Sequence, residues 1–199
     1  MRKGLRTGLS LAALTLLALM SLAGCTTHLA LNYPKPLTEP RQAANGESLV
    51  VVNFTDSRTD KKLFVAEGTL GLGSVKLAKP NAVGAWAARA LAAELTHAGV
   101  RAVVVNSVVD AQTPVVVTGT VSKIFTRDYG PAMFMRSEVD FSLVVTNDGK
   151  TVFRRTYEGV ASRPFFGGPT AARDIEAAMA AALQHGMVRA APDVIDVAH

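Results

Sequence analysis

The sequence predicts an α/β fold: a single mixed sheet that contains a three-stranded antiparallel meander and carries two packed helices. Two short runs of β-branched residues, at 48–54 and 100–105, flank a stretch with helical periodicity. Three longer segments then alternate between apolar and polar residues, and a second helical period follows. This order is typical of helices packed against one sheet.

Residues 1–24 have the composition of a secretion signal. Arg2, Lys3 and Arg6 precede an apolar run at 9–22. A transmembrane helix needs about 20 apolar residues, and this run is shorter. It ends in Leu-Ala-Gly-Cys at 22–25, which resembles the lipobox of bacterial lipoproteins, where a peptidase cuts before an acylated cysteine. We therefore expect residues 1–24 to be cleaved and Cys25 to carry lipid such as palmitate.

Cys25 is the only cysteine in the chain, so an intrachain disulfide is impossible. Each buried methylene of an acyl chain contributes about 0.8 kcal/mol, so the two or three chains of a lipoprotein anchor would hold the protein to its membrane without spanning it. In lipoproteins, an aspartate after the cysteine is associated with retention in the inner membrane. Thr26 stands there, so the resemblance implies the outer membrane, with the protein facing the periplasm.

Charge and length bound the mature protein. The whole chain has 21 Lys+Arg and 16 Asp+Glu. Removal of the signal leaves 175 residues with 18 basic side chains against 16 acids, a net charge of +2. That length suits one domain. Basic residues are not interleaved with aromatics in any run, so nucleic acid is not expected as a partner.

Residues 25–46 contain the lipidated cysteine and three prolines, which favours an extended tether. At about 3.1 Å per residue it could reach about 65 Å from the anchor. Leu29, Leu31 and Tyr33 also alternate as in a short edge strand, and the sequence leaves both alternatives open.

Residues 47–199 are predicted to form a single domain. A buried strand at 48–54 leads into a long loop or an irregular hairpin through 62–65. A helix follows at 82–98, with Trp86 on its apolar face and Gly99 as its stop. A strand at 100–105 comes next.

The meander strands are expected at 114–126, 136–146 and 151–161. Asn-Asp-Gly-Lys at 147–150 predicts a tight hairpin, because Asp-Gly tolerates positive φ angles. Thr170 caps the second predicted helix, and the tail from Pro192 is expected to be short and frayed.

Catalytic and metal-binding patterns are missing from the sequence. Asp56, Asp60 and Glu67 superficially resemble a calcium loop, but Arg58 stands where an oxygen ligand is needed. We expect a strand-end turn with a local Arg–carboxylate pair instead. No catalytic residue, cofactor or metal site is predicted, and the protein is not expected to be an enzyme.

The lipobox, the segment 51–60 with its Asp-x-Arg-x-Asp stretch, the helix at 82–98 and the later strands and helix together resemble the YajG-like periplasmic lipoproteins. The element order is also similar to the amino-terminal domain of TolB and to LpoB-type activators of peptidoglycan synthases. These resemblances imply a fold and a location, and no catalytic residue is carried over from them.

The remaining candidate site is a set of apolar residues in two connections that a meander brings to the same end of the sheet. They could form an exposed patch or complete the core, and their residues are Tyr129, Met133, Phe134, Met135, Phe165 and Phe166. We expect a non-enzymatic binding or adaptor lipoprotein with a protein partner in the cell envelope. The alternatives are a regulatory partner of an envelope enzyme or export machine, and a carrier of an apolar ligand such as a lipid.

Overall fold

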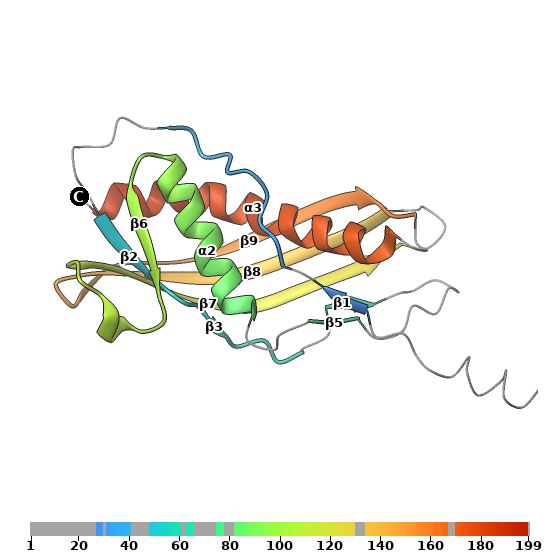
Figure 1. Ribbon diagram of the computed structural model, residues 1–199, viewed down its shortest axis with the longest axis horizontal. Coiled ribbons are helices and arrows are strands. Elements are labelled where there is room, and N and C mark those ends of the chain that lie inside the picture. Colours follow the sequence, from blue (N-terminus) through green and yellow to red (C-terminus); the bar gives the residue numbers. More distant parts are fainter. Residues whose placement is uncertain are drawn as a thin grey trace, which may run out of the picture.

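The computed structural model describes residues 27–29, 31–40, 48–60, 63–65, 75–77, 82–129, 134–166 and 170–198. Within these residues, two helices cover one face of a seven-stranded mixed sheet (Figure 1). The predicted α/β fold class is confirmed. The predicted signal peptide and Cys25 lie outside the described residues.

The main sheet has the strand order β6-β2-β7-β8-β9. β2 (Ser48–Val52) pairs in parallel with β6 (Arg101–Val105) and with β7 (Val115–Asp128). β8 (Phe134–Asn147) pairs antiparallel with β7 on one side and with β9 (Lys150–Pro164) on the other. At the end of the sheet where β7 stops and β8 starts, the strands are longer than predicted. β7 ends two residues later, β8 begins two residues earlier and β9 ends three residues later than the sequence indicates.

The irregular hairpin predicted through 62–65 is wrong for the part that the structure describes. β3 (Thr55–Asp56) and β4 (Phe64–Val65) each pair in parallel with β7, in line with β2. The five residues of β2 satisfy only part of the β7 edge, whose backbone groups need hydrogen-bond partners along all 14 residues. The chain after β2 therefore continues along β7 in short pieces.

Helix α2 (Ala82–His97) forms where the sequence predicts it. Trp86, Leu91 and Leu95 are buried and belong to the main core. The helix ends at His97, and Gly99 two residues later has a φ of 101°, which is unfavourable for residues with a side chain. The amide of Val100 then donates to the Leu95 carbonyl, which satisfies one of the free carbonyls at the helix end.

Helix α3 (Ala171–Ala198) includes the tail that was predicted to fray, so that prediction is wrong. Pro192 lies inside the helix and lacks an amide hydrogen. Packing outweighs this loss, because Val194 and Ile195 are buried. Asp193 also accepts hydrogen bonds from the Tyr157 hydroxyl at 2.7 Å and from Arg155 at 2.8 Å, which tie the last turns to β9.

The main core lies between the helices and the sheet, and Phe141 of β8 is fully buried there. Close approach depends on small residues: a Cβ atom at Gly159 of β9 would overlap the Ala182 carbonyl of α3, and one at Gly186 would overlap the Phe141 ring. A second, smaller sheet pairs β1 (Thr27–Leu29) in parallel with β5 (Val75–Leu77).

Candidate functional site

The two apolar connections lie at one end of the sheet. In the β7–β8 register Asp128 is opposite Met135, and in the β8–β9 register Phe134 is opposite Pro164. The Tyr129 amide donates to the Phe134 carbonyl at 2.9 Å. We call this end, where β7 and β9 finish and β8 begins, the loop end of the domain.

The predicted patch residues separate into two groups. Tyr129, Phe134 and Phe166 are 46%, 51% and 72% exposed. Met135 is fully buried, so its predicted place in an exposed patch is wrong, and Phe165 is half-buried against the core. Met135 is buried because β8 begins at Phe134. Side chains alternate between the two faces of a strand, so the side chain after Phe134 points toward the helices. Met133 lies outside the described residues.

A pocket with a volume of about 390 Å³ lies at the loop end, on the face of the sheet opposite the helices. Its lining residues are Lys123, Phe125, Arg127, Tyr129, Arg136 and Glu138. Three of these side chains are cations and one is a carboxylate, which gives a net charge of +2. The pocket is therefore suited to anionic groups.

In this pocket, the mutual hydrogen bond of Glu138 and Lys123 favours the charged forms of both side chains. Glu138 accepts from Lys123 at 2.5 Å and from Arg136 at 2.9 Å. The hydrogen bond with Lys123 lowers the pKa of Glu138, and the same hydrogen bond raises the pKa of Lys123. Arg127 stacks over the Phe125 ring, 5.5 Å from its centroid, and stands directly opposite Arg136 in the register.

Residues 31–40, which we call the N-terminal strap, lie against α2 and α3. Glu94 of α2 is fully buried and accepts hydrogen bonds from the strap. The Tyr33 hydroxyl donates at 2.6 Å, and the Leu37 amide at 3.0 Å. Thr38 donates from its amide at 2.8 Å and from its hydroxyl at 2.7 Å. Burial and the hydrogen bond to Glu94 raise the pKa of Tyr33 far above its usual range.

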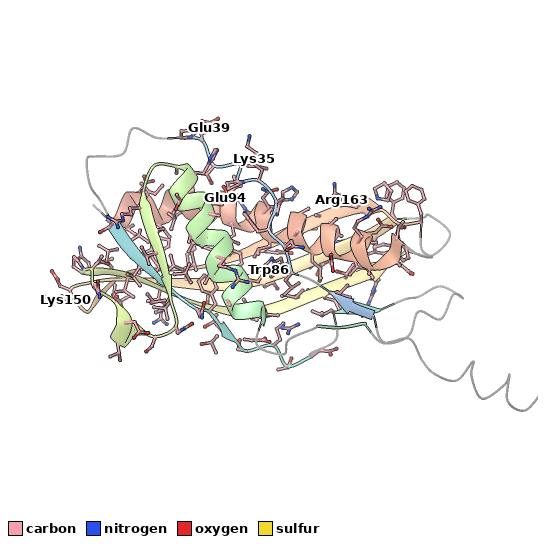
Figure 2. All side chains as sticks on the ribbon, in the orientation of Figure 1. Lys35, Glu39, Trp86, Glu94, Lys150 and Arg163 are labelled. Atoms are coloured by element: carbon pink, nitrogen blue, oxygen red, sulfur yellow. The ribbon has the colours of Figure 1, made fainter. Side chains whose placement is uncertain are left out.

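Further contacts hold the strap along its length (Figure 2). Trp86 donates from its indole nitrogen to the Asn32 carbonyl at 3.1 Å, and Gln184 of α3 donates to the Lys35 carbonyl at 2.6 Å. Leu29, just before the strap, is buried in the core. Of the two alternatives that the sequence left open for this stretch, a free spacer does not fit residues 31–40.

The strap also forms part of a second pocket, with a volume of about 360 Å³. Asn32 and Tyr33 line it together with Arg163 from the end of β9 and Arg173 from the first turns of α3. Arg163 is exposed and donates to the Ala177 carbonyl of α3 at 3.3 Å, so it lies on the helix side of the sheet. Cations thus stand on both faces of the sheet near the loop end.

The Asp-x-Arg-x-Asp segment forms the expected local ion pair. Arg58 is buried and donates to both carboxylate oxygens of Asp56 at 2.8 Å. In the part of the chain that the structure describes, His, Cys, Asp and Glu do not gather in any group of three or more that could hold a metal ion. Trp86, predicted as a core residue, is 1% exposed.

The hydrogen-bonded contact between Glu94 and the strap is the feature that sequence reasoning missed. A signal for it exists, because Glu94 lies three residues after Leu91 and directly before Leu95, at the apolar face of α2. An acid at such a position must find hydrogen-bond donors when the helix is buried. The sequence does not say which segment supplies them. Among the described helices, none is long and apolar enough to cross a membrane.

The sequence matches no protein-family model and no curated protein. Among solved structures it is similar to protein XCC0632 from Xanthomonas campestris, of family model DUF330, with a TM-score of 0.57 and 15% identity over 84% of this chain and 95% of that chain. It is also similar to lipoprotein GNA1162 from Neisseria meningitidis, with a TM-score of 0.35 and 16% identity over 59% of this chain and 84% of that chain.

The similarity to XCC0632 shows a shared fold, and the weaker similarity to GNA1162 supports no argument. Membership in the YajG-like lipoproteins is not confirmed by these comparisons and stays a prediction.

Proposed function

We propose that the protein is a lipid-anchored, non-catalytic interaction module of the bacterial cell envelope. In this proposal acyl chains on Cys25 hold it in the outer membrane, and the folded domain faces the periplasm. The observation that carries the proposal is the Leu-Ala-Gly-Cys sequence at 22–25, placed directly after an apolar run of signal-peptide length.

The position of β1 (Thr27–Leu29) supports this reading. β1 begins two residues after the cysteine at which the mature chain is expected to start. In a mature protein that starts at Cys25, a strand would therefore follow the lipidated residue almost at once. The exposed aromatic residues of the loop end are its proposed interaction surface, because aromatic side chains exposed together mark binding sites more often than inert surface.

The anchor is tested by metabolic labelling with a fatty acid. The wild-type protein should take up label, and Cys25→Ser should take up none and accumulate as an unprocessed precursor. Label on the Cys25→Ser protein would contradict the lipobox assignment.

Location and partner need separate measurements. In membranes separated by density, the protein should be recovered with the outer membrane, because Thr26 offers no retention signal for the inner one. Recovery mainly with the inner membrane would contradict the proposed location. Crosslinking in cells should then capture a protein of the envelope in wild type at a level that falls when the anchor is removed.

A further inference from the structure

The lipid anchor and the folded domain are separated by almost no free chain. Cys25 is two residues before Thr27, so their Cα atoms are at most about 7 Å apart. Thr27 belongs to β1, which pairs with β5, and Leu29 of the same strand is 2% exposed. If Cys25 carries lipid, the membrane surface meets the domain close to β1.

β1 lies toward the loop end of the domain. Asn32 and Tyr33, which follow it, share a pocket with Arg163, and Arg163 pairs with Met135 at the start of β8. Further along the chain, Thr38 donates to Glu94 near the C-terminal end of α2. The strap therefore runs away from the loop end between Asn32 and Thr38. Along the long axis in Figure 1, β1 lies toward the same end as the tip of β7 and the start of α3.

The loop end has the chemistry of a surface that meets lipid headgroups. Tyr129, Phe134 and Phe166 are exposed there. Tyrosine is enriched at the boundary between headgroups and acyl chains, and phenylalanine buries its apolar ring just below the headgroups. Arg136 on one face of the sheet and Arg163 on the other are both exposed, and cations near a membrane surface attract anionic lipids.

The opposite end of the sheet differs in composition. Val109 is 91% exposed in the short 3-10 helix η1 (Val108–Asp110), which precedes β7. The Asp148 amide of the β8–β9 turn donates to the Pro114 carbonyl beside the start of β7. Asp148 offsets the charge of the exposed Lys150 in the same turn, and Asp110 adds a negative charge that would oppose binding to an anionic surface.

We propose that the loop end of the domain docks on the surface of the membrane that holds the anchor, with its aromatic side chains at the headgroups and Arg136 and Arg163 against anionic phospholipid. The inference rests on the proposed function, because the anchor at Cys25 brings this end to the membrane. It also names phospholipid as the occupant of the aromatic surface. A protein partner then contacts the faces of the domain that point away from the bilayer.

The test uses the lipidated mature protein in vesicles. Since the thiol of Cys25 is acylated, an introduced cysteine is the unique site for a fluorescent label. Labels at Phe166→Cys and, as the matched control at the other end, Val109→Cys are compared in vesicles whose headgroups carry a nitroxide quencher. We expect at least threefold stronger quenching at position 166 in vesicles that contain phosphatidylglycerol. Equal quenching at both positions, or more at 109, would overturn the proposal.

Charge is tested in the same system. Arg136→Gln with Arg163→Gln should reduce the quenching at 166 at least twofold, as should vesicles of phosphatidylcholine alone. Arg101→Gln with Arg154→Gln removes the same charge from exposed positions away from the loop end and should change nothing. If quenching at position 166 depends neither on lipid charge nor on the Arg136→Gln and Arg163→Gln changes, docking on anionic lipid is wrong.

Failure of the proposed function is recognised separately. A purified protein whose mass shows no acyl chain on Cys25 refutes the anchor before any vesicle is used. A protein that is acylated and inserted, but whose label at 166 stays unquenched, refutes only the docked orientation. Crosslinks in cells from position 166 to a protein instead of lipid would likewise assign the loop end to a protein partner and overturn this inference.

Discussion

Replacement of Glu94 by alanine should detach the N-terminal strap and strongly destabilise the domain. The change removes the acceptor of four donors, which are two amides and two hydroxyls of Tyr33, Leu37 and Thr38. A hydrogen bond to a charged group contributes about 1.5–3 kcal/mol. The loss is smaller than the sum over four hydrogen bonds, because the donors of a detached strap can form hydrogen bonds with water. We expect the free energy of unfolding to fall by about 3–5 kcal/mol.

Two further variants calibrate this loss. Glu94→Gln keeps one oxygen for Thr38 and can donate its amide to the Tyr33 oxygen. The charge and the acceptor of the Tyr33 hydroxyl proton are lost, and the cost should be about 1–2 kcal/mol. Glu39→Ala removes an exposed acid from the strap itself and should have almost no effect.

The assay combines chemical denaturation with hydrogen exchange at the strap amides. Glu94→Ala should lower the melting temperature by about 10 °C and remove the protection of the Leu37 and Thr38 amides. The reasoning would be refuted if Glu94→Ala unfolded with nearly wild-type free energy and kept that protection.

Three further outcomes are expected. Burial raises the pKa of Asp140, so ionisation of this carboxyl opposes folding. Asp140→Asn should therefore raise the melting temperature at pH 7. This gain should disappear below about pH 3.8, where Asp140 is protonated in the unfolded chain as well as in the folded one. A gain that persists at pH 2 would contradict this cause. Gly159→Ala should cost about 3 kcal/mol in a denaturant titration, because its methyl group would overlap the backbone of α3; an unchanged midpoint would refute the close packing. Phe134→Ser with Phe166→Ser should leave the melting temperature almost unchanged, whereas Met135→Ser should cost about 3 kcal/mol, and equal effects would show that exposure at the loop end is misassigned.

The long elements of the fold were predictable because periodicity averages over many residues. The helix predicted at 82–98 is observed at Ala82–His97, since Trp86, Leu91 and Leu95 fix its apolar face. The short strands β3 and β4 were missed because two residues carry no periodicity. They form only because the long edge of β7 offers hydrogen bonds to a chain that happens to run beside it.

The errors at the candidate site also arise where local periodicity carries no information. The prediction placed residues 129–135 in a loop, but β8 begins at Phe134, and one residue decides which face Met135 occupies. The end of α3 was lost because proline usually stops a helix, whereas the contacts of Asp193, Val194 and Ile195 are tertiary and leave no local signal. The pairing of Glu94 with the strap spans more than 50 residues, which no window of sequence covers.

The lipid anchor decides both the proposed function and the docked orientation, and the mass of the amino-terminal peptide measures it directly. Mature protein isolated from membranes should begin at Cys25, and that peptide should carry the added mass of a diacylglycerol group on the thiol. An amino terminus at any other residue, or Cys25 with a free thiol, would contradict the central claim.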